Sequence, residues 1–308
     1  MNGSTMSDWI ALDWGTSNLR AWLVSENGEI LEHVNSDKGM GQLAPAEFEP
    51  VLISLIDHWL SENLVTQVMA CGMVGARQGW IEAPYSTLPS NLGAVSSVQA
   101  PVSDPRIAVT VLSGLSQSQP SSNVMRGEET QIVGYLNACP KFNGALCLPG
   151  THTKWVHVRN GEIVNFATCM TGELYSLISN HSVLRHSLGD NIWSDEAFKT
   201  ALLECLKRPE TLGINLFGIR AADLLQSKPS HEAKSTLSGM LIGFELASAK
   251  NYWFDQHVVL IGDKGLSKLY QVGLNSQGIT TSCEDATAMT LEGLCAAYQY
   301  HTRRADEA

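Results

Sequence analysis

The feature that most constrains this chain is a strand and turn pattern that occurs twice, once in each half of the sequence. Residues 10–13 and 19–24 are typical of strands around a polar turn, and the tetrapeptide NGEI at residues 27–30 predicts a hairpin that leads to a third strand. Residues 144–166, GALCLPGTHTKWVHVRNGEIVNF, repeat the order of strand, Gly/Thr turn, strand, NGEI turn and strand. The repetition predicts two similar domains, each of which opens with a β-meander.

Helices and strands alternate after each meander. Apolar residues recur at helical spacing in FEPVLISLIDHWL, residues 48–60, which precedes the strand TQVMACGMVG. We expect further helices at residues 128–136, 237–250, 266–272 and about 285–300, and further strands at residues 107–112, 145–148 and 257–262. A length of 308 residues with 44% hydrophobic composition suits two domains with a cleft between them. The expected fold is α/β, divided into residues 1–140 and 141–308.

Charge and cysteine usage narrow the class of protein. Lys and Arg number 20 against 31 Asp and Glu, and the formal charge of −11 argues against nucleic acid or an anionic membrane as a partner. The seven cysteines are odd in number and form no CxxC pair, which disfavours a disulfide framework and a zinc site. The N-terminus lacks the pattern of a signal peptide, and no apolar run approaches the ~20 residues of a membrane span. We expect a cytoplasmic protein that acts on small molecules.

The first polar turn has the chemistry of a phosphate site. Gly15, Thr16, Ser17 and Asn18 can direct backbone N–H groups and hydroxyls at one point, which favours an anion. Asp13 would repel a phosphate there unless a divalent cation lay between them, and Mg²⁺ prefers one or two carboxylates with waters and phosphate oxygens. The alternative is an ordinary hairpin that Asp13 caps and in which Gly15 supplies a positive φ.

The second turn favours the phosphate interpretation. LPGTHTKW, residues 148–155, again places a glycine, two threonines and a lysine between strands. Two such hairpins in opposite domains could hold one triphosphate between them, which a single turn could not indicate.

Five segments of the chain resemble one known family. ALDWGTSNLRAWL, CGMVGARQGW, VMRGEETQ, LPGTHTKWV and MTGELYSL are similar, in order and over roughly residues 9 to 300, to segments of the 2-dehydro-3-deoxygalactonokinase family. These sugar-acid kinases belong to the superfamily of actin, Hsp70 and hexokinase. The resemblance implies two ribonuclease H-like domains with a central cleft, ATP and Mg²⁺ as cofactors, and phosphoryl transfer to the C6 hydroxyl of 2-dehydro-3-deoxy-D-galactonate.

The resemblance also implies roles for the residues of both turns. Asp13 would hold Mg²⁺, and Thr16 and Ser17 would bind the γ- and β-phosphates. The remaining residues expected at the nucleotide are Gly15, Asn18, Gly150, Thr151, His152, Thr153, Lys154 and, for adenosine, Gly262. The second turn lacks the aspartate that many superfamily members have there, so Asp13 is expected to be the only carboxylate on the metal. His152 is either a hydrogen-bonding structural residue or an acid or base.

The catalytic base is expected at a helix start in MRGEETQ. Phosphorylation of a hydroxyl needs a carboxylate that orients the alcohol and accepts its proton. Glu128 and Glu129 lie about where hexokinase-like kinases carry this base, and helical phase does not choose between them. The alternative is that both acids only complement the helix dipole. Glu173 in MTGEL is a third candidate for the base, and it is also expected at the substrate. It too lies in a first helical turn, with Thr171 as the cap.

The substrate carboxylate calls for an arginine, because the planar guanidinium matches carboxylate geometry. Arg77 and Arg126 are the main candidates, with Arg20 beside them. Gln78 could bind hydroxyls and Trp80 could stack on the carbon chain, although Trp80 suits a hydrophobic core equally well.

Other functions remain possible at this point. A phosphohydrolase of the exopolyphosphatase type shares the fold, but it would need a basic channel that a charge of −11 argues against. Another sugar or sugar-acid kinase of the superfamily would carry the same motifs. A sugar-sensing regulator would carry a helix-turn-helix module ahead of the first turn, where only nine residues precede Ile10. The expected partners are a small sugar acid and ATP, and the sequence leaves a homodimer open.

Overall fold

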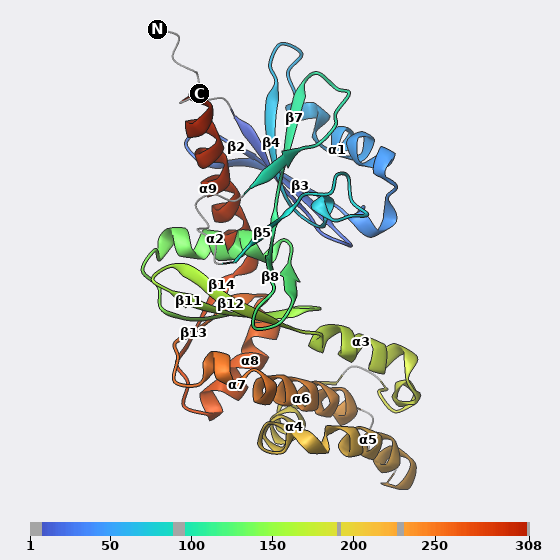
Figure 1. Ribbon diagram of the computed structural model, residues 1–308. Coiled ribbons are helices and arrows are strands. Elements are labelled where there is room, and N and C mark those ends of the chain that lie inside the picture. The colour runs from blue at the N-terminus through green and yellow to red at the C-terminus, as the bar shows by residue number, and fades with distance from the viewer. Residues whose placement is uncertain (1–7, 89–95, 190–191, 227–230, 307–308) are drawn as a thin grey trace. The chain divides into compact units, whose positions relative to one another are not determined.

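The structure is a computed structural model that describes residues 8–88, 96–189, 192–226 and 231–306. The chain forms two compact units (Figure 1). Unit 1 comprises Met1–Phe142, Asn160–Asn165 and Ala286–Ala308, and unit 2 comprises Asn143–Arg159 and Phe166–Asp285.

A six-stranded sheet in the order β3-β2-β1-β4-β7-β6 forms the centre of unit 1. Its strands are β1 (Trp9–Trp14), β2 (Leu19–Val24), β3 (Ile30–Ser36), β4 (Thr66–Gly72), β6 (Ser97–Gln99) and β7 (Ile107–Leu112). β1, β2 and β3 are antiparallel neighbours, β4 runs parallel to β1 and β7, and β6 is antiparallel to β7. The expected first meander is confirmed, and Gly28, with a φ of 85°, lies in its NGEI turn.

Different helices cover the two faces of this sheet. The helices of unit 1 are α1 (Phe48–Ile56), α2 (Glu128–Ala138) and α9 (Ala286–Asp306) within the described ranges. Successive side chains of a strand point to opposite faces. Ile10 and Leu12 therefore pack with α1, whereas Trp9 stacks on Tyr298 of α9 with ring centroids 4.2 Å apart. The same alternation puts Asp13 on the α9 face.

A second, three-stranded sheet of unit 1 comes from the irregular, proline-containing part of the sequence. It consists of β5 (Tyr85–Thr87), β8 (Gly114–Gln117) and β9 (Asn123–Met125) in the order β5-β8-β9. β9 ends just before α2, so this sheet lies in sequence between the segment of residues 71–80, which contains the candidate substrate residues Arg77, Gln78 and Trp80, and the helix that carries Glu128 and Glu129.

A five-stranded sheet in the order β12-β11-β10-β13-β14 runs through unit 2. Its strands are β10 (Gly144–Leu148), β11 (Thr153–Arg159), β12 (Glu162–Cys169), β13 (Val258–Gly262) and β14 (Thr281–Asp285). β10 is antiparallel to β11 and parallel to β13, as β1 is to β2 and β4. Asn160 and Gly161 both have positive φ in the second NGEI turn, which confirms the repeated pattern.

Helices occupy most of the rest of unit 2. They are α3 (Thr171–His181), α4 (Asp195–Lys207), α5 (Leu212–Gln226), α6 (His231–Ser248), α7 (Lys250–Trp253) and α8 (Lys264–Ser276). α6 packs against α4 and α5, and the three helices lie together in Figure 1. Phe198 and Leu202 of α4 share an apolar core with Ile242 and Leu246 of α6.

Two segments of the expected second domain, residues 141–308, are grouped with unit 1 instead. They are Asn160–Asn165 and Ala286–Ala308, and the second contains α9, which packs against α2 and against β1 and β4. A Cβ atom on Gly134 of α2 would stand 2.1 Å from the carbonyl oxygen of Met289, so glycine permits this close helix contact. Among the described residues, no helix combines the length and the apolar composition that crossing a membrane would take.

Candidate functional site

The first polar turn leaves β1 as a tight loop that a neighbouring segment supports. The amide of Gly15 donates to the carbonyl of Asn18 at 2.9 Å, and the amides of Met40 and Gly41 donate to the carbonyls of Gly15 and Thr16. Gly39 must be glycine, because a Cβ there would stand 2.3 Å from the turn's backbone. The side chains of Thr16, Ser17 and Asn18 are exposed, so their hydroxyl and amide groups can reach a ligand.

Asp13 is the residue before the last one of β1, in a largely buried position. It lies opposite Arg20 in the β1–β2 register, and the Arg20 guanidinium donates to its Oδ2 atom. The other guanidinium nitrogen of Arg20, Nη1, donates to Thr287 of α9 at 2.8 Å. Burial raises the pKa of Asp13, and Arg20 opposes that rise.

The start of α2 lies at the same strand ends as Asp13. Gly72 at the end of β4 and Gly127 before α2 both have positive φ, and a Cβ on Gly127 would be 3.4 Å from the Cα of Gly72. Cys71 of β4 lies opposite Asp13 in the β1–β4 register and is buried. Burial raises the pKa of its thiol, and the charges of Asp13 and Glu129 raise it further. The structure thus places Asp13 and Glu129 of α2 near the same buried thiol.

The two glutamates of α2 differ in burial. The side chain of Glu129 is 1% exposed, and its Oε2 atom accepts the amide of Gly127 at 2.7 Å. Burial, together with the charge of Glu128, raises the pKa of Glu129 to about 8. Glu128 is only half-buried, and its Oε2 atom accepts the amide of Arg126 at 3.1 Å. Glu128 is therefore the glutamate with surface for a substrate.

The guanidinium of Arg126 has N–H groups without a hydrogen-bond acceptor among the described residues. Its Nη2 atom donates to the carbonyl of Ala83 at 2.7 Å, and the guanidinium carbon lies 4.4 Å from the ring centroid of Tyr85. Its Nε and Nη1 atoms are buried without a hydrogen-bond partner in the described part of the structure. Buried N–H groups without acceptors are unfavourable, so this guanidinium is suited to an anionic ligand.

The other residues of the predicted substrate motif lie differently. The side chain of Arg77 is 80% exposed and pairs with Glu82 at 3.4 Å, and Gln78 is also exposed. Trp80 is 7% exposed and lies in the core with Trp14 and Phe48. The packing alternative fits Trp80, which has little surface left for a ligand.

The second polar turn has an exposed tip and a buried base. Thr151 and His152 are exposed, whereas Thr153 and Lys154 are buried. The hydroxyl of Thr153 pairs with that of Tyr270 at 3.0 Å, and Nζ of Lys154 donates to the carbonyl of His152 at 2.9 Å. Thr151 and His152 are therefore accessible to a ligand, whereas the side chains of Thr153 and Lys154 contact other parts of the protein.

The start of α3 is docked on this second turn. The amide of Glu173 donates to the carbonyl of Thr151 at 3.0 Å, and a Cβ on Gly172 would stand 2.5 Å from the carbonyl oxygen of Gly150. The Glu173 carboxylate hydrogen-bonds Nε2 of His152. Glu173 is thus engaged at the second turn, and His152 is held by it.

A largely apolar pocket of about 280 Å³ adjoins the second turn. It is lined by Gly150, Thr171, Gly172, Tyr175, Trp193, Ser238, Leu241, Ile242, Leu266, Leu269 and Tyr270. Gly262, expected at adenosine, does not line it, but a Cβ on Gly262 would stand 3.3 Å from Pro149, so the β13–α8 connection lies directly against the turn.

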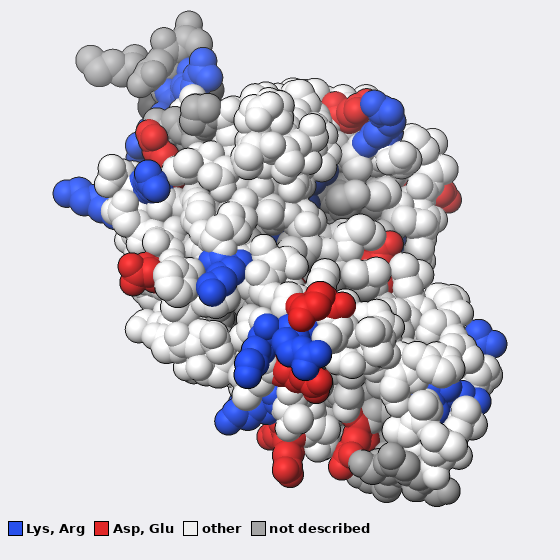
Figure 2. All heavy atoms as spheres, turned by 60° about the horizontal axis from the view of Figure 1, so that its bottom comes forward, with Lys and Arg blue, Asp and Glu red and all other residues white. Residues whose placement is uncertain are grey.

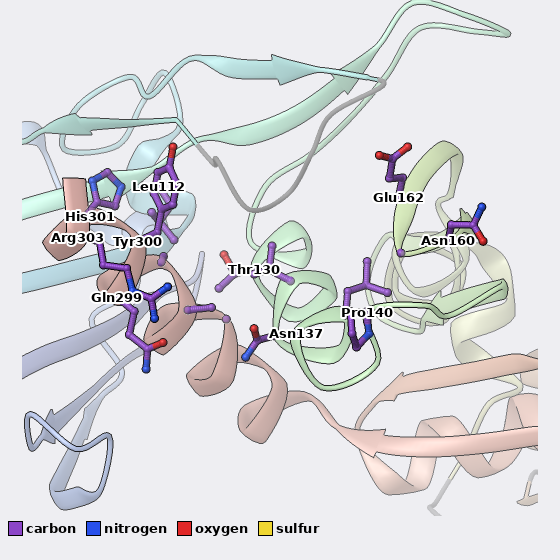
Figure 3. A pocket seen from close by; sticks show the side chains of 16 residues that line it. Leu112, Thr130, Asn137, Pro140, Asn160, Glu162, Gln299, Tyr300, His301 and Arg303 are labelled. Carbon is purple, nitrogen blue, oxygen red and sulfur yellow. The ribbon is translucent and has the colours of Figure 1, made fainter. Parts of the chain in front are cut away.

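A separate pocket of about 520 Å³ lies in unit 1 (Figure 3). Tyr300, His301 and Arg303 line one side of it, Glu162 lines the other, and Thr130 lies between them. None of the predicted site residues lines this pocket. Within unit 1, Asp13 and Glu129 lie at the ends of the central strands and not at this pocket.

Sequence reasoning missed Glu245, a buried carboxylate close to the second turn. It was assigned only to a core helix, and it accepts hydrogen bonds from Trp155 and Tyr270, both at 2.8 Å. An acidic residue at helical spacing between the apolar Ile242 and Ala249 was the available signal.

The repeated meander and polar turn of the two units define the class of fold. Two units that each open with a β-meander and a polar turn form an actin-like ATPase fold. The same fold occurs in component A of (R)-2-hydroxyglutaryl-CoA dehydratase from Acidaminococcus fermentans, with a TM-score of 0.51 at 11% identity over 96% of this chain and 99% of that chain. The expected fold class is confirmed.

Closer relatives then give the family. A family model described as 2-keto-3-deoxy-galactonokinase matches residues 13–297. The 2-dehydro-3-deoxygalactonokinase of Escherichia coli (strain K12) is 36% identical over 272 residues, 88% of this chain and 90% of that protein. A crystal structure of a Sinorhizobium meliloti protein, described as a 2-dehydro-3-deoxygalactonokinase, has a TM-score of 0.88 at 35% identity and covers 94% of this chain and 98% of that chain. The chain belongs to the 2-keto-3-deoxy-galactonokinase family.

Proposed function

We propose that this protein transfers the γ-phosphoryl group of ATP to the C6 hydroxyl of 2-dehydro-3-deoxy-D-galactonate. The observation that carries the choice of a sugar acid is Arg126, whose Nε and Nη1 atoms are buried and have no hydrogen-bond partner among the described residues, just before the helix that carries Glu128 and Glu129. A substrate carboxylate supplies the acceptors that these N–H groups lack, in the planar geometry that suits arginine.

Glu128 is the base in this proposal. Its carboxylate orients the C6 hydroxyl and accepts its proton as the oxygen bonds to the γ-phosphorus and the bond from that phosphorus to the ADP oxygen breaks. Glu128 is chosen over Glu129 because it is half-buried, whereas Glu129 is 1% exposed and bonded to the amide of Gly127. Glu129 then shapes the Gly127 turn from which α2 begins.

Each polar turn offers donors that suit phosphate oxygens. The exposed hydroxyls of Thr16, Ser17 and Thr151 are available as donors, and His152 is held in place by Glu173. Glu173 acts here as the partner of His152 and not as the base. The pocket beside Gly150 receives the nucleoside, since it adjoins the turn and is largely apolar.

Mg²⁺ fits Asp13 as a single carboxylate ligand. In the described ranges, no three His, Cys, Asp or Glu side chains gather to hold a metal ion by themselves. Mg²⁺ commonly takes one or two carboxylates and completes its shell with phosphate oxygens and water, so Asp13 with the nucleotide suffices. Bound there, the ion would neutralise charge that develops on the phosphates.

The family and its relatives from Escherichia coli and Sinorhizobium meliloti carry the names of kinases, which favours phosphoryl transfer to a sugar acid over hydrolysis of polyphosphate. Figure 2 agrees with this choice, because on the face that it draws, Lys and Arg are interspersed with Asp and Glu among the described residues rather than gathered in a basic channel.

A coupled ADP-release assay tests the proposal. The purified chain is mixed with ATP, MgCl₂ and each member of a panel of 2-keto-3-deoxy sugar acids and simple hexoses. ADP should form only with a sugar acid, and phosphorus NMR of the product should place the phosphate on C6. Equal ADP release without an acceptor, or a preference for a hexose that lacks a carboxylate, would overturn it.

A further inference from the structure

Glu245 is a buried acidic residue for which phosphoryl transfer has no direct use. It lies on α6, is 1% exposed, and follows the apolar core residue Ile242 by one helical turn. Burial raises the pKa of this carboxyl group. A carboxyl group is unfavourable in such a place unless hydrogen bonds compensate for the lost water.

Four side chains provide that compensation. Nε1 of Trp155 donates to Oε1 of Glu245, and the hydroxyl of Tyr270 donates to Oε2, both at 2.8 Å. The side chains of Thr153 and Thr171 also hydrogen-bond the carboxyl group. Thr153 is joined to Tyr270 as well, so the five side chains form one connected network.

The partners of Glu245 come from three segments around the second turn. Thr153 and Trp155 begin β11, directly after the turn. Thr171 is the first residue of α3, and its neighbour Gly172 packs on the turn's backbone. Tyr270 belongs to α8, and together with Thr171 it lines the pocket beside Gly150. One carboxyl group therefore ties together both sides of the pocket and the base of the turn.

We infer that Glu245 is a positioning residue for the nucleotide. Its carboxyl group holds the second turn and the adjoining pocket in the arrangement that binds ATP, and it does so without touching the ligand. The inference rests on the proposed function in one respect, because it assumes that this turn and pocket receive ATP.

A purely structural role for Glu245 makes a different prediction. A bond that only stabilises the core would, when removed, lower the melting temperature and leave the nucleotide affinity of the folded protein unchanged. A positioning bond would also change how ATP binds, while binding of the sugar acid stays the same, since no partner of Glu245 belongs to the proposed sugar-acid site.

The experiment compares Glu245→Gln and Tyr270→Phe with a matched control, Tyr252→Phe. Tyr252 is a buried tyrosine of the same apolar core, and its ring stacks on His157 at 4.5 Å. Each full-length variant is characterised by its melting temperature, the KM for ATP, the KM for the sugar acid, and calorimetric binding of MgATP. All assays are run well below the melting temperatures.

Tyr270→Phe removes the hydroxyl that hydrogen-bonds both Glu245 and Thr153, and it should raise the KM and the Kd for ATP roughly tenfold, the effect of about one net buried hydrogen bond. Glu245→Gln should do the same or more, and neither variant should change the sugar-acid KM. Tyr252→Phe should leave the ATP constants at the wild-type values. If Glu245→Gln does not fold, Tyr270→Phe and Thr153→Val carry the test.

Unchanged ATP constants in folded Tyr270→Phe and Thr153→Val would overturn the role of Glu245, as would an equal rise in Tyr252→Phe. The wild type separates this failure from failure of the proposed function. A wild type that phosphorylates the sugar acid while the variants bind ATP normally refutes only the positioning role, whereas a wild type without turnover on any sugar acid refutes the function itself.

Discussion

Replacement of Glu129 by glutamine tests whether the buried side chain of Glu129 at the start of α2 is protonated in the folded protein. Burial raises the pKa of this carboxyl group to about 8 from an ordinary value of 4.5. Between these two values the folded protein holds a proton on Glu129 that the unfolded chain has released. The folded state is thus favoured below pH 4.5, and the free energy of unfolding falls as the pH rises towards 8.

The size of this effect follows from the two pKa values. Each pH unit between them is worth about 1.4 kcal/mol, so from pH 5 to pH 8 this one group removes on the order of 4 kcal/mol from the free energy of unfolding. Glutamine resembles the protonated side chain and does not titrate. Between pH 5 and pH 8, the free energy of unfolding of Glu129→Gln should therefore fall by about 4 kcal/mol less than that of the wild type.

Urea unfolding at several pH values between 5 and 8 measures the difference, with amide hydrogen exchange in α2 as the local probe because the two units need not unfold together. Glu292→Gln is the control, since Glu292 is an exposed acid on α9 of the same unit. Parallel pH curves for the wild type and Glu129→Gln would show that Glu129 is ionised in the folded protein, and the burial argument would then be wrong.

Four substitutions test the proposed chemistry. Asp13→Asn should lower kcat by at least ~10²-fold with the fold intact, because the metal loses its carboxylate; near-normal kcat at saturating MgCl₂ would exclude this role. Arg126→Lys should raise the sugar-acid KM about tenfold or more and leave the ATP KM unchanged, whereas Arg77→Lys should change neither. Steady-state kinetics with each substrate varied decide this, and the reverse result would move the anchor to Arg77. Glu128→Gln should reduce kcat ~10²-fold with little change in either KM; full kcat in that variant, with a loss in Glu129→Gln, would reverse the assignment.

The repeated meanders were predictable because their signals are local. Alternating apolar residues, glycine-containing turns and the NGEI tetrapeptide depend only on neighbours in sequence, and the structure has them where the pattern placed them. The pairing of Asp13 with Arg20 was predictable in the same way. A turn of residues 15–18 places Trp14 opposite Leu19 and therefore Asp13 opposite Arg20.

The position of α9 depends on contacts that no local signal reports. Its helical pattern was predicted, but its return to unit 1 rests on glycines that let it approach α2, such as Gly293, where a Cβ would stand 2.0 Å from the carbonyl oxygen of Thr130. Burial of Glu129 rather than Glu128 has the same origin. Adjacent residues at a helix start look alike in sequence, and only the packing of Cys71 and Thr130 around one of them separates the two.

The three candidate arginines differ in the hydrogen-bond acceptors that their guanidinium groups already have. The Arg20 guanidinium donates hydrogen bonds to Asp13 and to Thr287. Arg20 therefore links the first turn to the start of α9 and stabilises the folded unit. Arg77 is exposed, and water can satisfy its donors at no cost to folding. Of these three, only Arg126 has buried N–H groups, those of Nε and Nη1, that lack an acceptor in the described ranges. Because an unpaired buried donor is unfavourable until a ligand supplies its acceptor, a carboxylate gains most affinity at Arg126. The sequence motif around each arginine was equally suggestive, and the surroundings of the guanidinium are what support the proposal that Arg126 binds the sugar acid.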